Sequence, residues 1–222
     1  MLLKTRTFII LSSFSFLFSS CLTAKKLDRK VAKEYADRAN LVQPLQNTDP
    51  IVISSPLIDQ SEQFSVSKTT TEKMLPLVLY WSWQYKNSCT LNSKIPVNML
   101  LAQLKKSGQL KDKLAGRKLE LTIDDIPNKF AIIDKAHLVL FLFGWDEISI
   151  RGDAANLTIK YKLLQDGAAI KSGEITVPAL ANMRGIGMFT SWKTATSDFL
   201  QRYDANIAAM GKTLIANLLK EL

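Results

Sequence analysis

The residue types that most often carry out chemistry are few in this sequence. The chain has two cysteines, Cys21 and Cys89, and one histidine, His137. A nucleophilic thiol needs a base beside it, and no pattern around His137 marks it as the base for Cys89. We therefore predict that Cys89 is a small buried hydrophobic residue. A single histidine also argues against a zinc site.

Carboxylates and glycines give no stronger sign of catalysis. Asp124 lies next to Asp125, and Asp146 lies next to Glu147. Neighbours on a strand point to opposite faces of the sheet, so neither pair forms a two-carboxylate site by itself. The sequence has no glycine-rich phosphate loop, nucleophile elbow or zinc-protease motif, and residues 185–187 are only a fragment of a dinucleotide fingerprint. We predict no enzyme activity, metal or cofactor, with a hydrolase as a minor alternative.

Cys21 has a different context, because it ends the apolar run at the start of the chain. A basic start is followed by an apolar stretch, residues 8–18, and by Ser19 and Ser20. A basic start, an apolar middle and small residues before the cut are typical of a secretory signal, and the stretch is shorter than a membrane span. The arrangement resembles the lipobox of bacterial lipoproteins, with Phe18 where that family usually has Leu, Val or Ile. An ordinary secretory signal is the alternative.

The resemblance implies that residues 1–20 are a signal peptide and that Cys21 becomes a lipidated amino terminus. Two or more acyl chains, palmitate among them, would anchor the protein stably in the bacterial cell envelope. Leu22 stands where aspartate would signal retention in the inner membrane, so we expect the outer membrane, facing the periplasm. The partners expected are the membrane and an envelope protein, and not nucleic acid. A basic segment follows the cysteine and suits a membrane-proximal position; a solvated helix with mixed charges is the alternative. The segment contains Lys25, Lys26, Arg29, Lys30, Lys33 and Arg38.

The next part of the chain is polar and interrupted by prolines. Pro44, Pro50 and Pro56 occur among Gln, Ser, Thr and Asn, a composition that buries little apolar surface. We predict that residues 41–72 form a mobile tether, although residues 51–53 could pair as a short edge strand. The predicted organisation is a signal peptide at 1–20, a lipidated cysteine, basic segment and tether at 21–73, and one domain at 74–222.

Hydrophobic periodicity within residues 74–222 predicts a strand, a helix, several strands and a final helix. Aromatic and β-branched residues indicate a strand over 75–91, in which Trp81 and Trp83 share a face. Stacking against a sugar is one role for them, but core packing or anchoring an interface is favoured. Residues 137–145 read as a strand covered on both faces. The remaining elements of this domain are a helix from Pro96 to Gly108, a strand at 119–123, a hairpin at Asp166-Gly167 and a helix at 199–222. Before the domain, a short helix is predicted at 27–35.

These elements predict an α+β fold with two layers, in which two main helices pack on one face of a mostly antiparallel sheet. The order of these elements resembles that of the auxiliary lipoproteins of ABC-type transport systems, whose fold is related to the amino-terminal domain of TolB-type periplasmic proteins. The elements are the helix PVNMLLAQLKKSG, the strand KLELTI, the antiparallel group that includes NLTIKYKLLQDGAAIKSGEITV and the last helix, which ends in LIANLLKEL. The resemblance implies a non-enzymatic adaptor or auxiliary component in envelope transport or assembly. A structural or regulatory lipoprotein that contacts peptidoglycan or its synthases is the alternative.

One segment, residues 182–192, has neither a strand period nor a helix period. Methionine and aromatic side chains serve well as adaptable contact surfaces, and an arginine among them could bind a lipid head group. The segment either covers the core or docks onto a membrane or a partner. The candidate contact residues are Met183, Arg184, Met188, Phe189 and Trp192.

Overall fold

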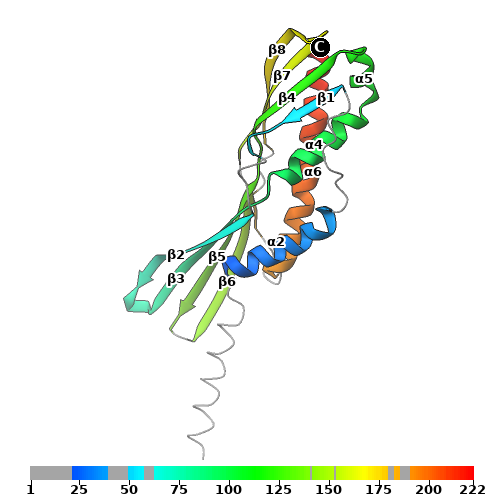
Figure 1. The fold of residues 1–222 in the computed structure, drawn as a ribbon. Coiled ribbons are helices and arrows are strands. Elements are labelled where there is room, and N and C mark those ends of the chain that lie inside the picture. The colour runs from blue at the N-terminus through cyan, green and yellow to red at the C-terminus, as the bar shows by residue number, and fades with distance from the viewer. Residues whose placement is uncertain are drawn as a thin grey trace, which may run out of the picture.

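In a computed structural model, the structure describes residues 22–39, 50–57, 63–140, 142–152, 154–179, 183–185 and 191–222. These residues form two β-sheets that lie end to end, with the helices along one side of both (Figure 1). The elements in chain order are α2 (Ala24–Ala39), β1 (Ile51–Ser54), β2 (Phe64–Leu75), the 3-10 helix η1 (Pro76–Val78), β3 (Tyr80–Thr90), α4 (Lys94–Lys106), α5 (Gly108–Leu114), β4 (Lys118–Asp125), β5 (Lys129–Val139), β6 (Phe143–Gly152), β7 (Leu157–Gln165), β8 (Ala168–Val177), β9 (Met183–Gly185) and α6 (Trp192–Glu221).

The strands of the two sheets alternate along the chain. The first sheet has the order β1-β4-β7-β8 and the second has the order β2-β3-β5-β6-β9. Every pairing is antiparallel except that of β1 with β4, which is parallel. The predicted α+β class with helices on one face is confirmed, but the strands form two sheets where the sequence suggested one.

A proline separates the two sheets where the chain passes from β4 to β5. Pro127 has no backbone N–H, so it cannot continue a strand ladder. The segment is held from both sides: the Leu91 N–H donates to the Asn128 carbonyl at 2.7 Å, and the buried Tyr203 hydroxyl of α6 donates to the Pro127 carbonyl at 2.6 Å. The junction between the sheets is therefore held by hydrogen bonds to Leu91, directly after the end of β3, and to Tyr203 of α6.

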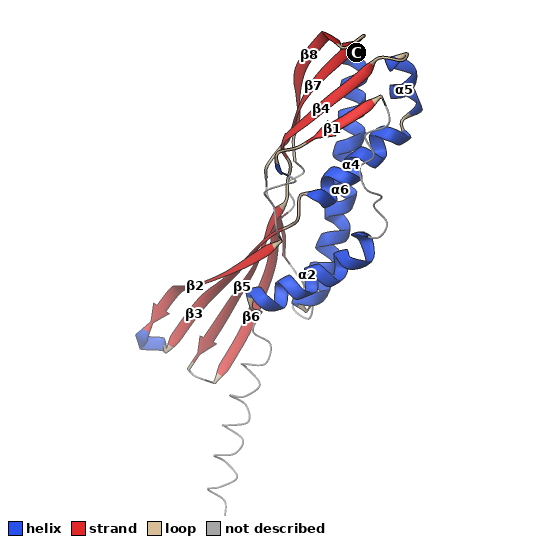
Figure 2. Cartoon of the chain, viewed as in Figure 1, coloured by secondary structure: helices blue, strands red, loops and turns tan. Residues whose placement is uncertain are grey.

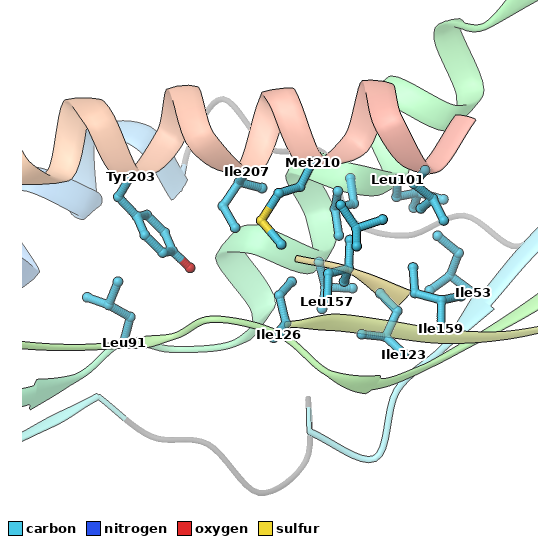
Figure 3. Close-up of a cluster of buried hydrophobic side chains, with 14 of the residues drawn as sticks. Ile53, Leu91, Leu101, Ile123, Ile126, Leu157, Ile159, Tyr203, Ile207 and Met210 are labelled. Atoms are coloured by element: carbon cyan, nitrogen blue, oxygen red, sulfur yellow. The ribbon is translucent and has the colours of Figure 1, made fainter. Parts of the chain in front are cut away.

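Helix α6 runs along both sheets and closes the core (Figure 2). The side chain of Ser191 caps its start by accepting a hydrogen bond from the Thr194 N–H at 3.2 Å. Its apolar stripe packs against residues of β4, β7 and the sheet junction (Figure 3). Each buried aliphatic side chain contributes about 1.5–3 kcal/mol of transfer free energy. The buried stripe consists of Leu200, Tyr203, Ile207, Met210, Leu214 and Leu218.

Helix α2 packs on the five-stranded sheet, against β2 and β3. Leu27, Val31 and Tyr35 recur every fourth residue and are all buried, which confirms the apolar face predicted for this helix. The Ala24 N–H donates to Ser67 Oγ of β2 at 2.8 Å, so the start of α2 is bound to the sheet.

Two strands occupy part of the segment where the sequence predicted a mobile tether. β1 pairs with β4, which confirms residues 51–53 as an edge strand. β2 pairs with β3 along its whole length, so the predicted boundary between residues 73 and 74 falls inside a strand. Most of its side chains are polar and nearly all are exposed, but its backbone ladder provides the order that its composition did not reveal. Residues 40–49 and 58–62 lie outside the described residues.

The prediction of one buried strand at residues 137–145 is wrong. β5 ends at Val139 and β6 begins at Phe143, and the two strands pair as a hairpin. Around the turn, Leu140, Leu142 and Phe143 are exposed. The apolar run bends back on itself, and within the part of the chain that the structure describes no other layer covers the turn.

Candidate interaction surface

Two neighbouring hairpin turns form one end of the five-stranded sheet. The first joins β2 to β3 through η1, and the second joins β5 to β6. The Leu140 N–H donates to the Leu79 carbonyl at 2.9 Å, so the two turns are hydrogen-bonded to each other. They lie at the opposite end of the molecule from the C-terminus (Figure 1).

The side chains at these two turns are large, apolar and exposed. Leu77 is 101% exposed and Leu142 is 79% exposed. An exposed cluster of this kind, at one place on the surface, marks an interaction site more often than a scatter of single residues does. We name this cluster the apolar tip, and it consists of Met74, Leu75, Leu77, Val78, Leu79, Leu140, Leu142 and Phe143.

Both turns contain a leucine in a backbone conformation that favours glycine or asparagine. Leu79 has a φ of 46° and Leu140 has a φ of 52°. For a leucine the left-handed region costs about 1–2 kcal/mol. The Asp166-Gly167 turn at the other end of the molecule, with φ of 52° and 83°, uses the residue types that suit such a turn. The tip therefore keeps apolar side chains at a cost in stability, which is typical of a functional surface.

Four aromatic side chains lie directly behind the apolar tip, on both faces of the sheet. Tyr80 and Trp145 lie on one face, because Tyr80 alternates with Ser82 and both Ser82 and Trp145 pair with His137. Trp81 and Trp83 lie on the other face. We name these four residues, Tyr80, Trp81, Trp83 and Trp145, the aromatic belt.

His137 connects two members of the belt. The Tyr80 hydroxyl lies 2.8 Å from His137 Nδ1. The rings of His137 and Trp145 stack with centroids 4.7 Å apart and planes 9° apart. Glu147 Oε1 lies 3.9 Å from His137 Nε2, and Glu147 is two residues further from the tip along β6 than Trp145. These contacts fix the orientation of the aromatic side chains on this face.

Going along the sheet away from the apolar tip, the first charged side chains lie beside the aromatic belt. The Lys135 ammonium lies 3.2 Å from Glu72 Oε2, joining β5 to the edge strand β2. On the other face, burial and, to a smaller extent, the negative charge of Asp146 together raise the pKa of Asp134 to about 6. Asp134 Oδ1 is buried with no hydrogen-bond partner among the described residues. No residue from Met74 to Tyr85, or from Leu138 to Trp145, is charged.

The contact residues predicted from the sequence lie elsewhere. The backbone of Met183 and Arg184 belongs to β9, which pairs with β6. Trp192 begins α6 and packs partly buried against the core, with Lys193 Nζ 5.8 Å from its ring centroid. Cys21, Met188 and Phe189 lie outside the described residues. For Trp192 the structure favours the core-covering interpretation of this segment.

The cysteine and histidine considered first are far from each other. Cys89 is buried in the core and 1% exposed, as its sequence context predicted, and burial raises the pKa of its thiol to about 11. It pairs with Phe130, seven positions along β5 from His137 and on the opposite face of the sheet. In the described residues no group of three or more His, Cys, Asp or Glu side chains is placed to hold a metal ion.

Sequence reasoning missed the apolar tip, although a signal was present. LVLYWSWQY and HLVLFLFGW were both read as strands. Pro76 stands at the start of the first run and marks the turn there. The second run has no turn-forming residue at its turn, because Leu140 occupies the position that glycine or asparagine usually fills.

No protein-family model, curated protein or solved structure matches this chain. Among the described helices, none is both long enough and apolar enough to cross a membrane.

Proposed function

We propose that this chain is a non-enzymatic envelope lipoprotein, anchored by lipid on Cys21, that acts as an adaptor or auxiliary component in envelope transport or assembly. The observation that carries the proposal is the apolar tip. An adaptor needs an exposed contact surface held in a fixed position, and the tip is the end of a five-stranded sheet whose other end is packed under α2 and α6.

The chemistry of the tip supports a contact role. Its side chains are hydrocarbon apart from one thioether, so they can bind but cannot transfer protons or attack a substrate. The strained turns at Leu79 and Leu140 indicate that apolar character matters there more than stability does.

The start of α2 supports anchoring close to the bilayer. Leu22 is buried, and the hydrogen bond from Ala24 to Ser67 joins the helix start to β2. A lipid on the preceding residue, Cys21, would therefore hold the folded sheet directly at the membrane surface. Lys25 and Lys26 are exposed at this point and suit contact with anionic head groups.

Two measurements test the proposal. Mass spectrometry of the membrane-bound protein should find a diacylglyceryl-modified Cys21 as the amino terminus, and Cys21→Ala should accumulate as unprocessed precursor.

In cells that lack the gene, the wild-type chain should restore the envelope barrier to detergents, whereas Cys21→Ala and Leu77→Asp should not. Ile170→Asp, an exposed apolar residue on β8, is the matched control and should restore the barrier. An unmodified amino terminus near residue 21 would contradict the anchor, and full activity of Leu77→Asp would contradict the role of the tip.

A further inference from the structure

We propose that the apolar tip inserts into a lipid bilayer to the depth of the aromatic belt. The inference deepens the proposed function, and rests on it in one respect: the lipid on Cys21 is what brings the tip to the membrane. Three independent features of the tip favour a bilayer over a protein partner.

The first feature is the order of side-chain types along the sheet. Aliphatic residues and one phenylalanine occupy the two turns, Tyr and Trp follow on both faces, and charged pairs begin level with the belt. A bilayer has the same order, because Trp and Tyr concentrate at the interface between hydrocarbon and head groups and charged residues remain in water. An elongated end that is surrounded by aromatic residues on both faces fits a planar lipid surface.

The second feature is the lack of polar side chains. From Met74 to Leu79 and from Leu138 to Gly144 the sequence has no side-chain hydrogen-bond donor and no charge. Protein interfaces are about as polar as the rest of the surface, with about one hydrogen bond per 100–200 Å². A surface without polar groups suits hydrocarbon, which offers no hydrogen bonds, better than it suits a specific protein partner.

The third feature is the backbone at the turns. An unpaired N–H or carbonyl is costly in hydrocarbon. The Leu79 N–H donates to the Pro76 carbonyl at 3.1 Å, and the Leu142 N–H donates to the Val139 carbonyl at 3.0 Å. The Leu140 N–H pairs with Leu79, and Pro76 has no N–H to satisfy. These donors are already paired before the tip meets lipid.

The position of α2 places the anchor and the tip at the same membrane. Ala24 is bound to Ser67, on the half of the molecule that carries the tip. Strand residues rise by about 3.3 Å each, so Ser67 lies roughly 26 Å from Leu75 along β2. An oblique orientation of the sheet would let both the acylated amino terminus and the tip reach one bilayer.

Fluorescence from a probe at the tip tests insertion directly. The acylated full-length chain with Leu77→Cys is labelled with an environment-sensitive fluorophore and added to phosphatidylcholine vesicles, with and without phosphatidylglycerol. The parent chain sets the background, since Cys89 is buried. We expect a blue-shifted emission that spin-labelled lipids quench. The same probe at Ala168→Cys, on the exposed start of β8, should show neither effect even though the acyl chains bind the protein to the vesicles.

Two variants separate insertion from stability. With the probe at position 77, Leu142→Asp should lower the inserted fraction roughly 10- to 100-fold, because it brings a charge into the hydrocarbon region. Leu140→Asn suits the left-handed turn, so it should keep or raise the melting temperature while it weakens insertion. Ile170→Asp should leave insertion unchanged. If the probe at position 77 shows no blue shift in vesicles that hold the protein, insertion is excluded.

Cross-linking in cells distinguishes this inference from the proposed function. A photoreactive residue at position 77 should form adducts with lipid. If it forms adducts with a single envelope protein instead, the bilayer contact is wrong and the adaptor role stands. If Cys21 is not acylated and lipid adducts still form, the anchor is wrong and the bilayer contact stands.

Discussion

One carboxyl group near the aromatic belt, that of Asp134, has a raised pKa. Asp134 is partly buried beside Asp146, and the pKa of its carboxyl is raised to about 6 in the folded protein, against 3.8 for an exposed aspartate. The folded state therefore binds more protons than the unfolded state between pH 4 and 6. The stability that this proton provides is present below about pH 4 and is lost as the pH rises through 6.

Replacing the Asp134 carboxyl by an amide should remove its contribution to the pH dependence of stability. We expect Asp134→Asn to stabilise the protein at pH 7.5, because the amide carries no charge to be buried. The gain should be only about 1 kcal/mol, because solvent reaches part of the Asp134 side chain. At pH 4 the substitution should have little effect. Melting temperatures of both proteins from pH 4 to 7.5 measure this. Asp112→Asn, at an exposed position on α5, is the control. A stability difference that did not vary with pH would show that Asp134 is charged in the folded state.

Among the elements, α4 and α6 approach each other closely at a glycine. A Cβ at Gly211 would overlap the Gln103 side chain and lie 3.2 Å from Leu100 Cδ2. Leu100 is fully buried, so it has little room to move. The small residue on α6 therefore sets the distance between the two helices.

A larger side chain at this position should force the helices apart. We expect Gly211→Leu to destabilise the protein by about 1–3 kcal/mol, although leucine favours helix more than glycine does. Ala216→Leu, at an exposed position of α6, should be neutral. Thermal unfolding of both variants measures the difference. Equal stability of Gly211→Leu and the wild type would mean that the helix pair adapts without cost.

The elements that the sequence predicted well are those with one buried face. Leu119, Leu121 and Ile123 of β4 alternate with polar residues and are all buried, as expected. The hairpin at Asp166-Gly167 was predicted from its turn residues and joins β7 to β8. Long apolar stripes and turns with characteristic residues are local signals, so the sequence alone reveals them.

The parts that could not be predicted depend on distant pairing or on unusual turns. β2 has mostly polar side chains, and its order comes from its hydrogen bonds to β3 and its contacts with α2, which are distant in the sequence from most of the strand. The turn at Leu140 has no residue that signals a turn at its left-handed position, and in the turn marked by Pro76 the left-handed position is also a leucine, Leu79. Division of the strands into two sheets depends on Pro127 and on Tyr203, which is distant from it in the sequence. The apolar tip could not be predicted because an apolar run rich in aromatic and β-branched residues is typical of a buried strand, and Leu140 does not indicate a turn at the surface.

The whole molecule presents two different ends. One end holds the apolar tip, and the other holds the β7–β8 hairpin, where Tyr161 and Lys171 contact Glu221 near the end of α6. The exposed residues of that second hairpin, Ile170 aside, are small or polar. Contact with a membrane is therefore expected at one end only, which is why β8 provides matched controls for the tip.

Alternation of the strands between the two sheets means that the molecule should unfold in one step. β2 and β3 belong to the second sheet, β4 to the first, β5 and β6 to the second, and β7 and β8 to the first, while α6 packs on both. No single cut of the chain separates one sheet from the other, so neither sheet is expected to fold as an isolated fragment. We expect one cooperative calorimetric transition whose calorimetric and van't Hoff enthalpies agree. Two resolved transitions would show that the sheets are independent in stability, and a protease-resistant fragment containing only one sheet would do the same.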